Sequence, residues 1–211
     1  MLRTNDDSRF WNGVARKYAT DRIKDMAGYE RTLERSRHFL SPTDTVLEIG
    51  CGTGTTALHL APSVARLVGT DVSSEMISIA QEKALLLGCR NAAFEVASAI
   101  DAPGADGAYD AVMAFNVLHL IADRPSTLAS IRRKLRPGGL LITKTPCLGE
   151  MNPLIRFVVP IARLVGKAPS VSFFNGTALA SDIEAAGFSL CVSERHGSGR
   201  KDARIFIVAR N

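Results

Sequence analysis

From residue 45 onward, short apolar runs alternate with stretches in which apolar residues recur at helical spacing. Apolar runs of strand length lie at residues 45–50, 65–73, 92–97, 109–118 and 137–146. Stretches with helical spacing lie at residues 55–61, 74–88, 124–135 and 176–187. Strands separated by helices of this length indicate a parallel sheet that helices cover on both faces. We expect Asp123 and Thr177 to cap the last two helices.

Two more apolar runs, residues 189–197 and 203–210, end the chain and are joined by a short polar turn. So short a connection permits only an antiparallel pair, because parallel strands need a crossover of a dozen or more residues. The pattern therefore predicts an α/β fold: a mostly parallel seven-stranded sheet with helices on both faces and an antiparallel edge hairpin. We expect residues 1–211 to form a single domain.

The segment before the sheet, residues 1–40, is expected to form a helical cap of two helices. Phe10, Val14 and Tyr18 recur at every fourth position, which places them on one helix face. This spacing suits Tyr18 to core packing as well as to a ligand contact.

An insertion, residues 147–175, follows the fifth strand on the side where open sheets bind ligands. Its apolar run is far too short to span a bilayer. Arg156 and Arg163 share a helical face there, and Pro160 is expected to kink or divide any helix. Three interpretations stay open: a helix packed on the core, a lid over an apolar substrate, or a basic amphipathic patch that contacts membrane lipid.

Composition narrows the class of protein. The chain has 46% hydrophobic and 22% charged residues, as is ordinary for a soluble globular protein. A net charge of +5 favours a nucleic-acid partner only if the charge gathers on one face, and no aromatic-basic stripe is present. The four cysteines are scattered without a C-x-x-C pair, so we expect no metal site and a cytoplasmic location with reduced thiols.

The first strand ends in a turn that contains Gly50, Gly52 and Gly54. Glycines between a strand and a helix N-terminus let a ligand approach the backbone, and open α/β sheets bind ligands at this end of their strands. Asp71 ends the second strand, where it can accept hydrogen bonds from both hydroxyls of a ribose. Together these residues predict a cofactor that contains a nucleoside.

Two residues discriminate between such cofactors. The dinucleotide fingerprint needs glycine at position 55, where this chain has Thr55. Glu48 lies inside the first strand, and its carboxylate would repel a pyrophosphate but attract an ammonium or sulfonium group. A charge in an apolar strand also needs a partner. A cationic cofactor is therefore favoured, and a nicotinamide-dependent dehydrogenase is the disfavoured rival.

The segments VLEIGCGTG, GTDVS, YDAVMAFNVLHLI and LRPGGLLI, in this order and spacing, resemble the class I S-adenosylmethionine-dependent methyltransferases. The resemblance covers residues 8–146 by motif and extends through the final strands. The N-terminal FWNGVARKYAT is distantly similar to the small-molecule branch that includes quinone-biosynthesis methyltransferases. The resemblance implies a Rossmann-like fold and methyl transfer to a small acceptor, which we expect to be lipophilic or aromatic.

The resemblance also implies which residues bind S-adenosylmethionine. Glu48 and Gly50 match the loop at the methionine part of the cofactor, and Asp71 matches the ribose-binding acid. Asn116 matches a position whose backbone faces the methionine ammonium group. The full expected set is Tyr18, Glu48, Gly50, Cys51, Gly52, Gly54, Asp71, Val72, Met76, Ser98, Ala99 and Asn116.

One position departs from the family pattern. Ser98 stands where family members commonly carry an aspartate that accepts a hydrogen bond from the adenine amino group. A serine hydroxyl can still accept this bond, but a charged acceptor is worth roughly 1–2 kcal/mol more. We therefore expect adenine to bind, and to bind less tightly than in relatives with the acid.

Candidate residues for the acceptor and for catalysis lie outside this set. His119 follows the fourth strand near the expected methyl group, and two roles stay open for it: a general base, or a side chain that packs at the strand end. Phe10, Trp11 and Phe157 are expected to line an acceptor pocket. Two alternatives to a small-molecule enzyme stay open: a non-catalytic S-adenosylmethionine-binding module, and a nucleic-acid methyltransferase. These patterns predict no particular oligomeric state.

Overall fold

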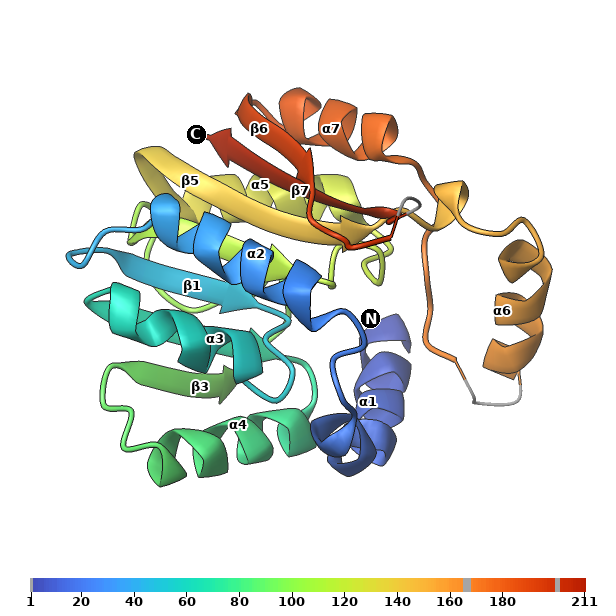
Figure 1. Cartoon of the computed structure of the whole chain (residues 1–211), viewed down its shortest axis with the longest axis horizontal. Helices are drawn as coiled ribbons and strands as arrows, with labels where there is room; N and C mark the ends of the chain where they lie inside the picture. Colours follow the sequence, from blue (N-terminus) through green and yellow to red (C-terminus); the bar gives the residue numbers. More distant parts are fainter. Residues whose placement is uncertain (1, 165–167, 200–201) are drawn as a thin grey trace.

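The computed structural model describes residues 2–164, 168–199 and 202–211. In this part of the chain one seven-stranded sheet has the strand order β3-β2-β1-β4-β5-β7-β6 (Figure 1). The strands are β1 (Thr45–Ile49), β2 (Arg66–Asp71), β3 (Ala92–Val96), β4 (Tyr109–Phe115), β5 (Leu135–Pro146), β6 (Ser189–Arg195) and β7 (Arg204–Arg210). The first five strands pair in parallel, and β7 pairs antiparallel with both β5 and β6. The predicted fold class is confirmed.

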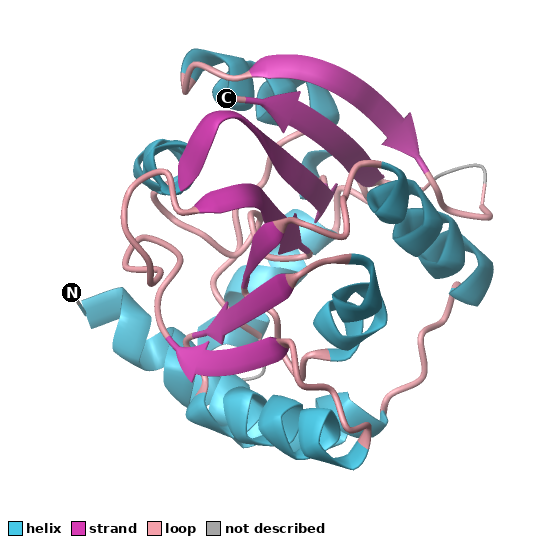
Figure 2. Ribbon diagram, turned by 90° about the vertical axis from the view of Figure 1, so that its left-hand side faces the viewer, coloured by secondary structure: helices cyan, strands magenta, loops and turns pink. Residues whose placement is uncertain are grey.

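Helices flank the sheet on both faces (Figure 2). They are α1 (Leu2–Thr20), α2 (Met26–His38), α3 (Thr55–Leu60), α4 (Ser74–Leu86), α5 (Arg124–Lys134), α6 (Ile155–Leu164) and α7 (Gly176–Ala185). Short 3₁₀ turns lie at Ala61–Ser63 and Leu148–Glu150.

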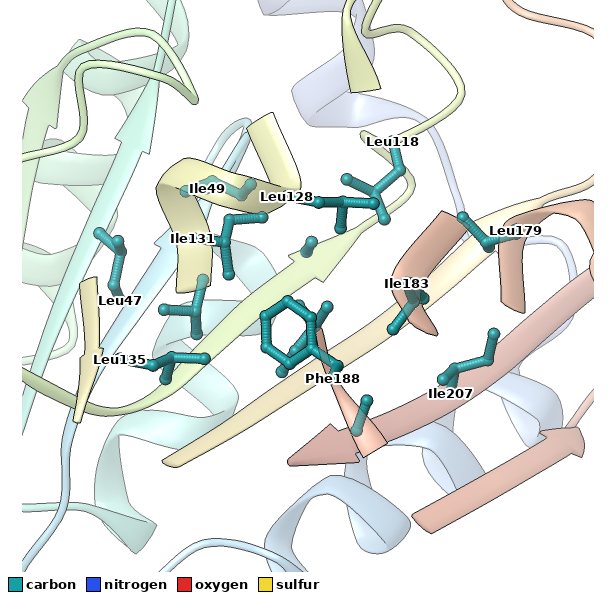
Figure 3. Packing of buried hydrophobic residues seen from close by; sticks show 14 of the residues in the cluster. Leu47, Ile49, Leu118, Leu128, Ile131, Leu135, Leu179, Ile183, Phe188 and Ile207 are labelled. Carbon is teal, nitrogen blue, oxygen red and sulfur yellow. The ribbon is translucent and has the colours of Figure 1, made fainter. Parts of the chain in front are cut away.

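Alternate residues of each central strand pack into two separate layers. Leu47 and Ile49 of β1 belong to the layer covered by α5 and α7, in which Leu128, Ile131 and Ile183 also lie (Figure 3). Val46 belongs to the opposite layer, which α2, α3 and α4 cover. Because side chains alternate along a strand, Glu48 shares the face of Val46.

The helix caps follow the sequence prediction at one of two positions. Asp123 caps α5, where its carboxylate accepts the Ser126 N–H at 3.1 Å. The prediction that Thr177 caps the last helix is wrong. Asn175 caps α7 instead, because its side-chain oxygen accepts the Ala178 N–H at 2.8 Å.

Helix α1 packs on α4 through a face that is shifted by one residue from the expected face of Phe10, Val14 and Tyr18. Ala15 is fully buried against Met76 and Ile79 of α4, with Trp11 and Ala19 beside it. The small alanine side chains let the two helices approach closely. Tyr18 lies at the margin of this contact with 49% of its surface exposed.

The insertion contains one α-helix, α6, among its described residues, after the 3₁₀ turn at Leu148–Glu150. Pro160 was expected to kink or divide a helix; it lies inside α6, which continues past it, so the helix is not divided. Leu154, Val158 and Ile161 are all more than half exposed, at spacings of four and three residues. Figure 1 shows α6 at the margin of the molecule, away from the sheet. The interpretation of α6 as a helix packed on the core is therefore the weakest of the three.

Candidate functional site

A cavity of about 830 Å³ lies where β1, β2 and β4 end. Its walls come from the loops after these strands, from α1 and α2, and from residues 169–170 of the insertion. The carboxyl ends of parallel strands are where open α/β sheets bind ligands, and this volume suits a ligand of cofactor size.

The turn after β1 forms one wall of the cavity. Gly50, Gly52 and Gly54 have φ angles of 62°, 54° and 72°, in the left-handed region that favours glycine. A Cβ at Gly50 would lie 2.4 Å from Val117 Cγ2, in the loop after β4. The two loops therefore close on each other through the bare glycine backbone, which fixes the shape of this wall.

Asp71 connects the turn to the end of β2. Its two carboxylate oxygens accept the N–H groups of Gly52 and Ser73, at 3.0 and 2.9 Å. Burial raises the pKa of Asp71, and these N–H groups oppose that shift. Each carboxylate oxygen has further acceptor capacity, so the orientation that suits two ribose hydroxyls is set by the protein itself.

Glu48 is the most buried charged group of the cavity wall, with 2% of its surface exposed. Its Oε2 has no hydrogen-bond partner among the described residues. Burial, with the negative charge of Asp71, raises the pKa of Glu48 to about 8. An unsatisfied buried carboxyl is costly, so Glu48 is suited to a ligand that brings a positive charge or donor to this wall.

Asn116 follows β4 in a strained conformation. Its φ of 53° is the only positive value at a non-glycine residue in the described part of the chain. The Asn116 N–H donates to the Lys144 carbonyl at 2.8 Å, which holds the turn at the cavity wall. Backbone strain of this kind collects at ligand sites.

Asp101, which the sequence motifs did not identify, places a carboxylate beside Ser98. The Ser98 hydroxyl donates to Asp101 Oδ2 at 2.8 Å, and the Asp101 N–H donates back to the hydroxyl at 3.1 Å. Both residues line the cavity. The charge that position 98 lacks is thus present three residues later, where only the loop conformation after β3 reveals it.

Most of the expected cofactor residues come together at this cavity. Its lining includes Tyr18, Glu48, Gly50, Cys51, Gly52, Asp71, Val72, Met76, Ser98, Ala99 and Asn116. Gly54 is not in the lining. It stands behind the turn, where an added Cβ would lie 2.8 Å from that of Ala80.

Only one of the three residues expected to line the acceptor pocket is found in the cavity lining that the structure describes. Trp11 lines the cavity, whereas Phe10 is outside the lining and contacts Trp11 edge to face at 5.2 Å between ring centroids. The side chain of Phe157 lies outside the described residues.

His119 does not line the cavity. Its Nδ1 is buried with no hydrogen-bond partner in the described part of the chain, and burial lowers the pKa of His119 to about 4. The His119 carbonyl accepts the Ser172 N–H at 2.7 Å, which anchors the returning end of the insertion. The geometry favours the structural alternative over general-base catalysis.

The cavity lining also includes residues that no sequence motif identified, among them Tyr29 and Thr32 of α2, Lys144 of β5 and Arg204 of β7. A signal for Lys144 existed. It is a charge inside an apolar strand, the same feature that identified Glu48.

Two further expectations concern metals and membranes. Within residues 2–164, 168–199 and 202–211 there is no cluster of three His, Cys, Asp or Glu side chains that could hold a metal ion. No helix in the same described ranges has the length and hydropathy needed to cross a membrane.

Comparison with known proteins agrees with the motifs. Residues 46–139 match the family model of a methyltransferase domain. A demethylmenaquinone methyltransferase of Symbiobacterium thermophilum is 30% identical over 134 residues, which cover 62% of this chain and 51% of the relative. Phosphoethanolamine N-methyltransferase 1 of Arabidopsis thaliana is 30% identical over 131 residues, which cover 59% of this chain and 26% of the relative. The chain thus matches between about a quarter and a half of the length of these relatives.

A solved structure shows the same fold. An S-adenosylmethionine-dependent methyltransferase of Mesorhizobium loti superimposes with a TM-score of 0.71 and 16% identity, over 88% of this chain and 98% of that one. At this identity the likeness concerns the fold alone. Residues 46–139 thus match a methyltransferase domain, in agreement with the motifs that resemble the class I S-adenosylmethionine-dependent methyltransferases.

Proposed function

We propose that this protein transfers a methyl group from S-adenosylmethionine to a small-molecule acceptor. The observation that carries the proposal is the buried, unsatisfied Glu48 carboxyl beside the glycine turn, in one cavity with the ribose-suited Asp71. A cationic donor would partner Glu48, while an anionic dinucleotide would be repelled by it.

The bound S-adenosylmethionine supplies an already activated methyl group, so the chain's residues need mainly to position the reactants and exclude water. Asp71 would hold the ribose, and Ser98 with Asp101 would accept from the adenine amino group. Tyr18 on α1 would cover the cofactor from the open side. No side chain needs to form a covalent bond with the acceptor.

The acceptor would occupy the part of the cavity beyond Asn116. Tyr29, Phe115, Leu120 and Ile121 line the cavity together with Trp11. An apolar and aromatic lining of this kind suits a lipophilic or aromatic molecule. The names of the two relatives cited above also point to small-molecule acceptors, and this supports the proposal without identifying the acceptor.

The insertion would act as a lid over the acceptor. Pro169 and Ser170 line the cavity, and the Ser172 N–H to His119 carbonyl bond fixes the segment that follows them. The exposed side chains of Leu154, Val158 and Ile161 would gain cover if α6 closed over the cavity. Contact of the same face with membrane lipid is the competing interpretation, which cosedimentation with anionic vesicles tests directly.

The free cysteines fit a reducing compartment, and we expect the protein to act in the cytoplasm.

Calorimetry provides the first test of function: S-adenosylmethionine and its demethylated product should bind, and NAD should not. Incubation of the protein with a metabolite extract and isotopically labelled donor should then give a labelled product by mass spectrometry. Donor binding without any labelled small molecule, across extracts and with nucleic acid as the alternative acceptor, would favour a binding module.

Trp11→Ala tests the placement of the acceptor. We expect the variant to lower turnover while cofactor affinity changes little, because the indole lines the cavity from α1. Unchanged turnover would place the acceptor elsewhere. Phe157→Asp tests the proposed lid by the same pair of measurements.

A further inference from the structure

Lys144 lies on β5, directly beside the end of β4. It pairs with Phe115 of β4 on one side and with Phe206 of β7 on the other. The side chain is 6% exposed, yet it lines the cavity. It shares the sheet face of Phe115 and Glu48, since Glu48 pairs with Met113, two residues before Phe115.

The ammonium group of Lys144 has neutral partners only. Nζ donates to the Thr32 hydroxyl at 2.7 Å and to the Gly28 carbonyl at 3.3 Å, both on α2. No carboxylate forms an ion pair with it in the described ranges of the chain. An ammonium group has three donors, so one remains for a ligand in the cavity.

The charged neighbours of Lys144 do not neutralise it. Arg204, which also lines the cavity, is paired with Asp202 at 2.8 Å and with Asp25 at 3.5 Å. Arg31 on α2 adds a third cation and donates to the His196 carbonyl. Three cations thus face two carboxylates, an excess of one positive charge.

Strand β6 brings no compensating charge to this wall. Glu194 is engaged by Arg35 at 2.9 Å and by the His196 ring at 3.1 Å. Burial lowers the pKa of His196, which keeps its ring neutral at neutral pH. The excess positive charge therefore stays at Lys144.

We propose that Lys144, with Arg204 beside it, binds an anionic oxygen of the methyl acceptor. The acceptor would carry a carboxylate, phosphate or comparable oxyanion on an otherwise apolar or aromatic body. This inference rests on the proposed function and adds the charge of its substrate. Glu48 and Asp71 hold the cationic donor at one end of the cavity, and Lys144 orients the acceptor from the other.

A purely structural role does not account for this arrangement. A lysine that only tethered α2 to β5 would leave a buried cation without a counter-ion, and such a charge is costly. The Thr32 hydroxyl already has an intrahelical acceptor, the Gly28 carbonyl at 2.8 Å. A neutral donor would therefore serve equally well as the tether. A bound oxyanion, by contrast, would supply the counter-ion that the Lys144 ammonium group lacks.

Binding of model anions to the protein saturated with the demethylated cofactor tests the proposal. Benzoate and phenyl phosphate are the charged probes, and benzamide is the neutral probe of similar shape. We expect at least one charged probe to bind wild-type protein about tenfold more tightly than benzamide, by about 1.4 kcal/mol. Lys144→Met should abolish this preference and leave the affinity for benzamide unchanged. Lys144→Arg should retain it, and Lys134→Met on α5, outside the cavity lining, should behave as wild type.

A pH series keeps the test independent of variant folding. Burial lowers the pKa of Lys144 to about 8, with the charge of Arg204 adding to the shift. The preference of wild-type protein for the charged probe should be present at pH 6.5 and fade as the pH rises through 8, because the ammonium loses its proton. In Lys144→Arg it should persist. Equal binding of all three probes to wild type, or a preference that survives in Lys144→Met, overturns the proposal. Failure to bind the demethylated cofactor at all would instead overturn the proposed function.

Discussion

Glu48 and Lys144 lie on the same face of the sheet, on either side of Phe115, and line one cavity with an acidic and a basic side chain. Glu48 pairs with Met113 of β4, and Lys144 pairs with Phe115 two residues further on. Their strands are separated by two strand spacings, which is about 10 Å across the sheet. The two groups form no ion pair in the described structure. Each is therefore available to a different ligand at its own end of the cavity.

Glu48 should make the protein without cofactor less stable as the pH rises. In the unfolded chain its carboxyl ionises near its ordinary pKa of 4.5, whereas in the folded protein burial raises the pKa to about 8. Between these values the folded state binds the extra proton, so the free energy of unfolding falls with pH, by at most roughly 1.4 kcal/mol per pH unit. Glu48→Gln should lack this contribution. Urea unfolding of both proteins from pH 5 to pH 8 measures it, and parallel curves would contradict the prediction.

The sequence revealed Glu48 but not Lys144, for a physical reason. Glu48 is adjacent to the glycine turn, so its charge could be read together with a local ligand site. Lys144 contacts Thr32, 112 residues away in sequence, and no periodicity predicts that α2 lies over β5. Asp101 was missed similarly, because the bend of the loop after β3, and not residue spacing, brings it to Ser98. Strands, by contrast, were predictable because their apolar runs are local.

Gly50→Ala should damage the cofactor site, and Gly88→Ala provides a matched control. Both glycines have a φ of 62°, so both substitutions carry a similar backbone cost of about 1 kcal/mol. A Cβ at Gly50 would also lie 2.4 Å from Val117 Cγ2, whereas nothing lies within 4 Å of one at Gly88. We expect Gly50→Ala to lose at least about tenfold in affinity for the demethylated cofactor by calorimetry, a loss of about 1.4 kcal/mol. If the two variants bind equally well, contact between the loops does not shape the site.

Asp101→Ala should weaken cofactor binding because Asp101 supplies the carboxylate that position 98 lacks. Loss of a charged acceptor is expected to cost about 1–3 kcal/mol. The exposed Asp106, in the same loop but outside the cavity lining, provides the control as Asp106→Ala. Affinity is measured by calorimetry with the demethylated cofactor and with its analogue that lacks the adenine amino group. Wild-type protein should discriminate between these ligands and Asp101→Ala should not. Retained discrimination would assign the adenine contact to Ser98 alone.

His119→Leu should keep methyl transfer nearly intact. Nδ1 of His119 is buried without a partner in the described chain, and the ring is outside the cavity lining. With a pKa near 4 the imidazole is a weak base. A positioned general base contributes about 10²–10⁴-fold to a rate, so its removal would be conspicuous. We expect kcat to change by less than about threefold, and the free energy of unfolding to stay level or rise, because leucine removes an unsatisfied buried nitrogen. The measurement is kcat against pH with the identified acceptor, beside urea unfolding. A hundredfold loss of kcat with unchanged stability would restore His119 as the base and require the ring to turn toward the cavity when the acceptor binds.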